Sequence, residues 1–434
     1  MDLIRRERAR SISPRPDRSS VEPRDCKAKN EIVRNETMLA TTQFEAVAEH
    51  SPVDARQIDL LIAWLTDGAR SATSTQSFVE ELCRRMVAAA IPLDRFGLFI
   101  HTLHPNVAAR RFLWTGAAGV TMQEGPIGLF SQDQHLKNPL PLVTSRQTSV
   151  RRMLTSPAAL DEFAILGELR DEGFTDYLAQ PLIFTTGETH AATFSTKHPA
   201  GFTGEQLTAL ERVRQPLARI VEAHLLRTNA ACIISTYAGR GSGGQILQGR
   251  VHRGDGEEIA AAILFADLIG FTDLSNNLSG QQMVETLNDA FDVVVPLVAA
   301  NGGEVLKFLG DGFFAIFPYD QERRIDEAVR SARQTILEGE ERLAEAPVGK
   351  KVAFRWALHA GRFHYGNIGG AGRLDFTAIG RPVNYAARLL AAASDLSLKH
   401  VASAAVAEYL CTAPQMTAEV DFKGFEGRQK IYSC

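Results

Sequence analysis

Residues 263–272 read ILFADLIGFT, an apolar strand that closes on Asp267 and enters a turn at Gly270. A second acid, Asp311, follows within residues 309–313, LGDGF, a pattern typical of a hairpin tip. Carboxylates at strand ends beside glycine turns are suited to hold hard divalent cations against bound phosphates. The pair therefore indicates metal-assisted phosphoryl chemistry.

The length, composition and charge of the chain limit the number of domains and the kinds of partner that it can have. The chain has 434 residues, 45% hydrophobic and 23% charged, which suits two globular domains plus some unstructured length. Its formal net charge of -4 gives no overall basic field, so we expect no nucleic-acid partner.

Cysteine usage and the termini favour a cytoplasmic protein. The five cysteines are scattered and form no Cys-x-x-Cys pair, which argues against a disulfide framework or a zinc ribbon. The charged start of the chain is followed by no apolar signal segment. No apolar run approaches the roughly 20 residues that span a bilayer, so no transmembrane segment is expected.

The first half divides into a tail and a mixed domain. Residues 1–53 are rich in arginine, serine and proline and are predicted to be a disordered basic tail. Residues 54–230 carry helix patterns at Ile58–Leu65, at Ser77–Ala90 and after Gly204. Strand patterns lie between them, at residues 95–101, 111–114, 179–184 and 191–196.

This mixed domain is similar to GAF-type sensor domains. The resemblance runs from Asp54 to Thr228 and rests on Leu178-Ala179-Gln180-Pro181-Leu182 and on Phe202-Thr203-Gly204-Glu205-Gln206-Leu207 before a long helix. It implies a small-molecule ligand of unknown identity. Residues 231–256 contain the cluster YAGRGSGG, which lacks the Gly-Lys-Ser/Thr of a phosphate loop and is interpreted as a glycine-rich linker.

Residues 257–434 show strands and helices in alternation. After the strand that ends at Asp267, Ser279 is placed to cap a helix over Gly280–Ala300. A hairpin of Glu304–Phe308 and Phe313–Phe317, a helix over Glu322–Ala344 and a strand over Val352–Gly361 are predicted next. A last major helix begins after Gly380, and Asn384 and Arg388 share one face of it.

Together these residues resemble the catalytic domain of class III nucleotidyl cyclases, over about Ala260 to Tyr409. The motifs that carry the resemblance are FADLIGFT at 265–272, KFLGDG at 307–312 and TAIGRPVNYAAR at 377–388. They imply an α+β fold, a ferredoxin-like palm with a central, mostly antiparallel sheet. They also imply a head-to-tail homodimer with its active sites at the subunit interface.

The resemblance also implies a role for each residue of the site. Asp267 and Asp311 would bind two Mg²⁺ or Mn²⁺ ions, one activating the ribose 3′-hydroxyl and one screening pyrophosphate. The backbone amides of Ile269, Gly270, Phe271 and Thr272 would hold the outer phosphates. Asn384 would fix the ribose, and Arg388 would neutralise charge in the transition state.

Base choice depends on Lys307 and Thr377. Adenine N1 is an acceptor that suits the donor-only ammonium of Lys307, whereas guanine N1 carries a proton. Thr377 can accept from adenine N6 or donate to guanine O6, so it leaves both bases open. Lys307 favours ATP and cyclic AMP.

One position departs from the family pattern, and two other functions stay open. Arg381 stands where relatives usually have Asp in the Gly-Asp-x-Val-Asn run. The first alternative function is a guanylate cyclase. The second is a degenerate cyclase fold that only binds nucleotide or mediates dimers.

Overall fold

The computed structural model describes residues 51–132, 137–156, 162–345, 352–370, 372–410 and 415–433. The predicted basic tail, residues 1–53, lies outside these ranges except for its last three residues. No helix in the described ranges combines the length and the apolarity needed to cross a bilayer.

The N-terminal domain is built on a six-stranded antiparallel sheet in the order β3-β2-β1-β6-β5-β4. Its strands are β1 Arg95–His101, β2 Val107–Thr115, β3 Gly119–Pro126, β4 Val150–Met153, β5 Asp176–Ile183 and β6 Thr189–Thr196. Its helices are α1 Ala55–Thr66, α2 Thr75–Ala88, α4 Pro139–Arg146, α5 Ala164–Asp171 and α6 Gly204–Ala238, with a 3₁₀ turn, η1, at Leu129–Ser131.

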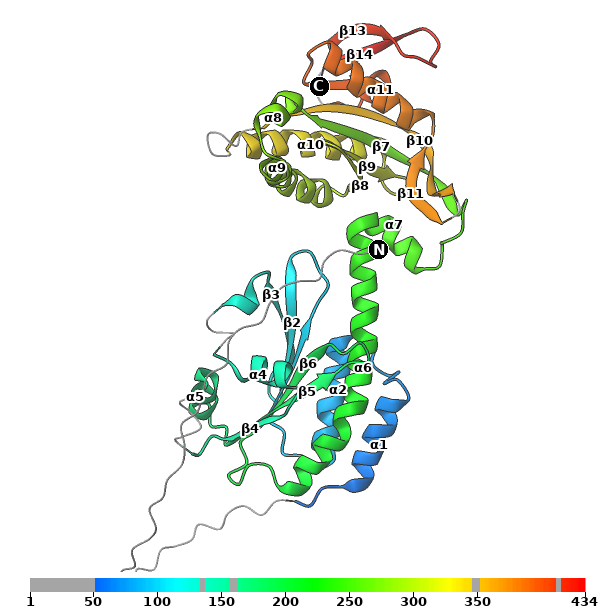
Figure 1. Ribbon diagram of the computed structural model, residues 1–434. Helices are drawn as coiled ribbons and strands as arrows, with labels where there is room; N and C mark the ends of the chain where they lie inside the picture. The colour runs from blue at the N-terminus through cyan, green and yellow to red at the C-terminus, as the bar shows by residue number, and fades with distance from the viewer. Residues whose placement is uncertain are drawn as a thin grey trace, which may run out of the picture. The chain divides into compact units, whose positions relative to one another are not determined.

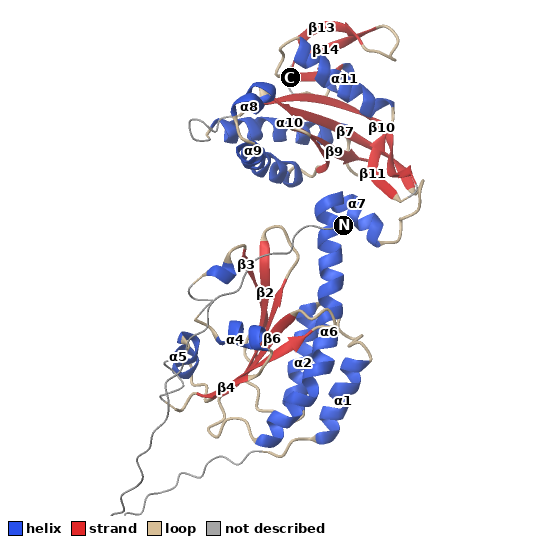
Figure 2. Ribbon diagram, viewed as in Figure 1, coloured by secondary structure: helices blue, strands red, loops and turns tan. Residues whose placement is uncertain are grey.

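Two separate apolar layers cover the two faces of this sheet. One face packs against α1, α2 and α6 through residues such as Phe78, Phe96 and Leu217. The other packs against α4 and α5 through Val143, Leu166 and Ala179. Figure 2 shows α1, α2 and α6 together on one side of the strands, and α4 and α5 on the other. The mixed α+β prediction for this domain is confirmed, and its GAF identity stays a prediction.

The C-terminal domain contains an eight-stranded sheet in the order β13-β14-β12-β10-β7-β9-β8, with β11 paired to β10. The strands are β7 Gly256–Leu268, β8 Glu304–Leu309, β9 Gly312–Tyr319, β10 Phe354–Gly370, β11 Arg373–Ile379, β12 His400–Ser403, β13 Gln415–Asp421 and β14 Arg428–Ser433. The helices are α8 Phe271–Asn277, α9 Gly280–Ala300, α10 Ile325–Ala344, α11 Arg381–Asp395 and α12 Ala404–Ala407. Among the described strands only β10 and β12 pair in parallel, which confirms the mostly antiparallel sheet.

Strand alternation divides the core of this domain into two layers. On β7, residues 262, 264, 266 and 268 face α9 and α10, and residues 261, 263 and 265 face α11. Figure 1 shows α9 and α10 on one side of β7 and β10, and α11 on the other. Helix α9 begins where the sequence predicts, because Ser279 accepts from the Gln282 amide and the Gln282 side chain returns the bond.

Local hydrogen bonds explain where the predicted boundaries move. Helix α2 starts at Thr75, before the predicted Ser77, because Ser74 and Ser77 form its capping box. Helix α10 starts at Ile325, after the predicted Glu322, because the Asp320 carboxylate accepts the amides of Glu322 and Arg323 in a preceding turn. Strand β10 continues past the predicted Gly361 to Gly370.

The predicted glycine-rich linker, residues 231–256, is largely helical. Helix α6 runs on to Ala238, and α7, Arg240–Leu247, follows immediately. A Cβ on Gly243 would lie 2.9 Å from the Cα of Ser235. The glycine therefore permits the close approach of α7 to α6, which is a packing role that the sequence pattern does not reveal.

Helix α7 also contacts the C-terminal domain directly. The Gly241 amide donates to Oε1 of Glu304 at 2.6 Å. Ser242 Oγ shares a 2.5 Å hydrogen bond with the Tyr365 hydroxyl. Burial raises the pKa of the Glu304 carboxyl.

Substituting alanine at Gly243 tests the α6–α7 packing. We expect Gly243→Ala to lower the free energy of unfolding by about 1–3 kcal/mol, because the added methyl meets rigid backbone. Gly244→Ala is the matched control, since nothing lies within 4 Å of the position that its methyl group would take. Alanine there should be neutral or stabilise by up to about 1 kcal/mol through helix propensity. Urea unfolding measures both variants. An equal change in the free energy of unfolding for Gly243→Ala and Gly244→Ala would contradict the packing role of Gly243.

A buried histidine predicts how stability depends on pH. His359 shares a 2.6 Å hydrogen bond with Ser403, stacks on Tyr385, and has its pKa lowered by burial from 6.5 to about 4. The unfolded chain therefore takes up this proton first as pH falls. The contribution of His359 to stability is fully present above the pKa that this histidine has in the unfolded chain. It is lost as the pH falls toward the pKa of His359 in the folded protein.

We expect His359 to account for about 2 kcal/mol of stability lost between about pH 7 and about pH 5. Urea unfolding of the protein and of His359→Gln at both pH values measures it, and the variant should show a shallower pH slope. His252→Gln, at an exposed position, should keep the original slope. Equal slopes in all three proteins would contradict the assignment.

Candidate active site

The two predicted metal ligands, Asp267 and Asp311, lie side by side at one end of β7 and β9. The strands pair so that Asp267 is opposite Gly312. A Cβ on Gly312 would lie 2.1 Å from the Ala266 carbonyl oxygen, so only glycine allows this approach. The close approach brings the Asp311 side chain into hydrogen-bonding contact with Asp267.

The electrostatics of this pair suit a divalent cation. Burial raises the pKa of Asp267, and repulsion by Asp311 and their hydrogen bond raise it further. Arg355 lowers the pKa of Asp267, but its Nη1 lies as far as 4.0 Å from Oδ2 of Asp267. This one cation therefore neutralises the two carboxylates incompletely. Within the described ranges no group of three or more His, Cys, Asp or Glu is placed to hold a metal. The two hard oxygen donors therefore fit Mg²⁺ or Mn²⁺ whose remaining ligands are phosphate oxygens and water.

The turn at residues 269–272 carries the backbone amides that are predicted to hold the outer phosphates. The Ile269 amide donates to the Ala353 carbonyl at 2.8 Å, so it is already used within the fold. This hydrogen bond competes with the predicted contact of the Ile269 amide with phosphate, which stays a prediction. Gly270 takes the left-handed conformation, with φ of 75°, and α8 begins at Phe271 with Thr272 in its first turn.

Lys307 is linked to β11, the strand that carries Thr377, through Asp375, which is not among the predicted site residues. Lys307 follows a β-bulge in β8, and its ammonium forms an ion pair with the Asp375 carboxylate of β11. Asp375 and Thr377 project from the same face of β11, because Phe376 between them is buried. In the sequence, Asp375 could be found from its position two residues before Thr377, which places both side chains on one face of a strand.

Asn384 and Arg388 lie on the exposed side of α11. The helix buries Tyr385, Ala386 and Leu389 against the sheet. At about 100° per residue, Asn384 and Arg388 point away from that buried face. Neither side chain has a polar partner in the described part of the chain, so both are available to a ligand.

Arg381, the departure from the family pattern, packs within its own chain. Its guanidinium carbon lies 5.0 Å from the ring centroid of Phe425, a cation–π contact. Phe425 in turn packs edge-on against Tyr385. Arg381 therefore fastens the first turn of α11 to the segment between β13 and β14.

A comparison with known families gives this domain its identity. Residues 256–433 match the model of the adenylate and guanylate cyclase catalytic domain. This part of the chain is a nucleotidyl cyclase catalytic domain. Asp267, Asp311, Lys307, Thr377, Asn384 and Arg388 all lie within it.

Part of the chain is also similar to curated proteins. An uncharacterized protein of Mycobacterium tuberculosis (strain ATCC 25618 / H37Rv) is 37% identical over 136 residues, covering 31% of this chain and 24% of that protein. Adenylate cyclase 1 of Rhizobium meliloti (strain 1021) is 32% identical over 158 residues, covering 35% of this chain and 23% of that protein. The chain thus spans about a quarter of the length of these relatives.

Solved cyclase structures are also similar to part of this chain. The adenylyl cyclase CyaB from P. aeruginosa has a TM-score of 0.36 and 22% identity, covering 41% of this chain and 94% of that one. The guanylyl cyclase Cya2 has a TM-score of 0.36 and 21% identity, covering 41% and 92%.

Proposed function

We propose that the chain is an adenylate cyclase, which converts ATP into 3′,5′-cyclic AMP and pyrophosphate as a homodimer. The observation that carries the proposal is the adjacent, incompletely neutralised Asp267–Asp311 pair. In the reaction the ribose 3′-oxygen bonds to the α-phosphorus, its proton is lost, and the bond to the pyrophosphate oxygen breaks.

The chain's residues would bind and orient the triphosphate. Asp267 and Asp311 would hold two Mg²⁺ or Mn²⁺ ions. Such ions lower the pKa of a bound hydroxyl and stabilise a leaving pyrophosphate. The amides of Gly270, Phe271 and Thr272 would donate to the outer phosphates.

The residues of α11 would act on the reacting centre from a second chain. Asn384 would hydrogen-bond to the ribose, and Arg388 would neutralise charge that develops at the α-phosphorus. Both project away from their own sheet, so a triphosphate bound by the Asp267–Asp311 pair of a partner is the substrate they suit. The homodimer is therefore part of the proposed mechanism.

Base recognition favours adenine through Lys307. Its ammonium donates only, and adenine N1 accepts. The Asp375 carboxylate accepts one of the three N–H donors of Lys307, which leaves the other two for the base. Thr377, on the same face of β11, is placed to accept from adenine N6.

Asp375 is also the observation that favours the second candidate, a guanylate cyclase. A carboxylate accepts from both N1–H and N2–H₂ of guanine, and Asp375 is about half exposed. We propose that base choice depends on the ion pair between Lys307 and Asp375. If Asp375 stays bound to Lys307, the base meets a cation and adenine is preferred.

Initial rates with ATP and with GTP in the presence of Mn²⁺ test the proposal. We expect cyclic AMP to be the main product, and Lys307→Ala to lower kcat/KM for ATP by about tenfold to a hundredfold. Lys399→Ala is the matched control, because Lys399 is also paired with an acid, Glu340, but outside the site. A main product of cyclic GMP would establish the guanylate cyclase. No product from either nucleotide would favour the non-catalytic nucleotide-binding module.

We also propose that residues 54–230 form a GAF-like sensor domain that regulates residues 257–434. The continuous path from α6 through α7 to Glu304 and Tyr365 supports this. The test compares the full chain with a form that starts near Gly249, which lacks that path. Equal cyclase rates under all conditions would contradict regulation by this domain.

A further inference from the structure

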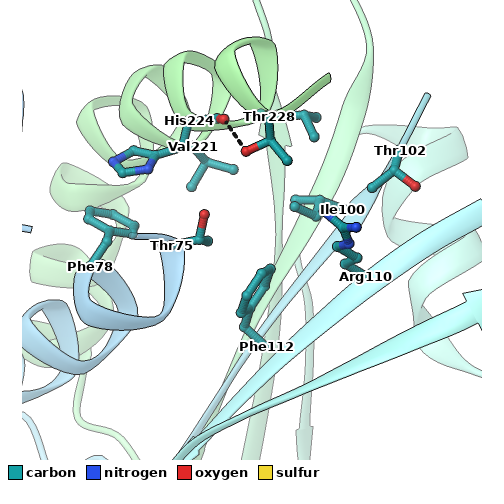
Figure 3. A pocket seen from close by; sticks show the side chains of 10 residues that line it. Thr75, Phe78, Ile100, Thr102, Arg110, Phe112, Val221, His224 and Thr228 are labelled. Atoms are coloured by element: carbon teal, nitrogen blue, oxygen red, sulfur yellow. Dashed lines mark hydrogen bonds between the residues drawn. The ribbon is translucent and has the colours of Figure 1, made fainter. Parts of the chain in front are cut away.

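The two faces of the N-terminal sheet are filled to different degrees. On the face covered by α2 and α6, side chains such as Phe78, Phe112 and Val221 leave a space of only about 20 Å³ (Figure 3). That space holds about one water molecule. On the opposite face, between the sheet and α4, lies a cavity of about 570 Å³. A cavity of this size is typical of small-molecule sites and not of a packed core.

The walls of this larger cavity are mostly apolar. Strands β1, β2 and β6 supply Phe99, Ala109 and Ala191 on one side. Helix α4 and η1 supply Leu140, Pro141, Leu129 and Phe130 on the other. The cavity therefore suits an apolar body.

Among the described lining residues the charged ones are Arg110, Arg111 and Glu124. Arg110 and Glu124 neutralise each other through a 2.9 Å ion pair. Arg111 donates to the Gln123 side-chain oxygen and has no carboxylate partner among the described residues. Two cations and one anion leave a formal charge of +1, and Arg111 carries it.

Arg111 is a costly group to leave in this position. The Arg111 guanidinium is partly buried and lies near the cation of Arg95, and both effects lower its pKa. An anion on the guanidinium would relieve both effects and form two parallel hydrogen bonds.

We propose that this cavity binds a small monoanion in which a carboxylate is joined to an apolar body. The carboxylate lies on Arg111, and the body lies between the sheet and α4. A phosphate monoester fits less well, because its charge of about -1.5 to -2 exceeds the single unpaired cation. A neutral apolar ligand would leave Arg111 unpaired.

Calorimetry on the full chain, without nucleotide, tests this proposal independently of cyclase activity. The probes are hexanoate, decanoate, cinnamate and naphthoate, each beside its neutral amide. We expect at least one acid to bind about tenfold more tightly than its amide, since a charged hydrogen bond contributes roughly 1.5–3 kcal/mol. Equal affinity of every acid and its amide, or no binding by any acid, would overturn the proposal.

Two variants assign the binding to this cavity. Arg111→Gln should remove the preference for the acid and leave amide binding unchanged. Arg170→Gln, at an arginine on α5 paired with Asp171, should leave both affinities unchanged. Thr144→Trp, which places a large ring in the cavity from α4, should abolish binding of both probes. If Arg111→Gln kept the preference for the acid, the anion would bind elsewhere and the proposal would fail.

Discussion

Asp311→Asn is expected to lower cyclic nucleotide formation by a factor on the order of 10³ or more, without loss of the fold. Several kcal/mol of transition-state stabilisation are lost when a site can no longer hold its divalent ions. The amide keeps the size of the carboxylate but removes its charge. Rates with ATP and saturating Mn²⁺ measure the loss.

The same variant should be at least as stable as the unchanged protein when both are free of metal. Asp311 raises the pKa of Asp267 by repulsion, so removing one charge relieves that strain. Thermal unfolding in the presence of a chelator measures this. Asp320→Asn, at an exposed acid beyond the other end of β9, is the matched control and should keep full activity. Near-normal activity in Asp311→Asn would contradict the metal-binding role.

The stability comparison separates chemistry from folding. Loss of activity with a lowered unfolding temperature would point to a damaged β7–β9 turn. Loss of activity with an unchanged or raised unfolding temperature would show that the Asp311 carboxylate itself is needed for the reaction. The close packing of Gly312 on Ala266 makes this distinction necessary, because the turn that carries Asp311 is also part of the sheet.

The sequence predicts best where local chemistry determines the structure. Helix α9 has its predicted bounds, Gly280–Ala300, because Ser279 and Gln282 cap it whatever the rest of the chain does. The turn that carries Asp311 is also predictable, since residues 309–313 join the two strands of the local β8–β9 hairpin. The sequence patterns do not predict β12, whose partners β10 and β14 are distant in sequence, or the local hairpin of β13 and β14.

The sequence pattern does not predict which side chains pair across the fold or where cavities lie. The ion pair between Lys307 and Asp375 joins strands that are far apart along the chain, with β9, α10 and β10 between them. The glycines of α7 resembled a linker, although Gly243 is required by the contact with Ser235. Arg111 resembled any other surface strand residue, and only the neighbouring α4 gives it a cavity to face.

Asp267→Ala and Arg388→Ala should each be inactive alone, yet a mixture of the two should recover activity. Arg388 projects away from the sheet that carries Asp267, so the two residues are expected to serve one substrate only across a dimer. In a heterodimer one site carries both substitutions and the other carries neither. With random pairing, half of the dimers are mixed and half of their sites are intact, so activity should return to about a quarter of the unchanged protein.

The matched control is a mixture of Asp267→Ala with Asp311→Ala. Both residues belong to the same half of the proposed site, so every site in such a heterodimer lacks one metal ligand. We therefore expect no recovery. Cyclic AMP formation in mixtures whose heterodimer content is verified by two affinity tags measures both cases. No cyclic AMP formation by the mixture of Asp267→Ala and Arg388→Ala would contradict a site shared between two chains. Recovery in the control mixture would show that Asp267 and Asp311 act in different sites, which the β7–β9 register argues against.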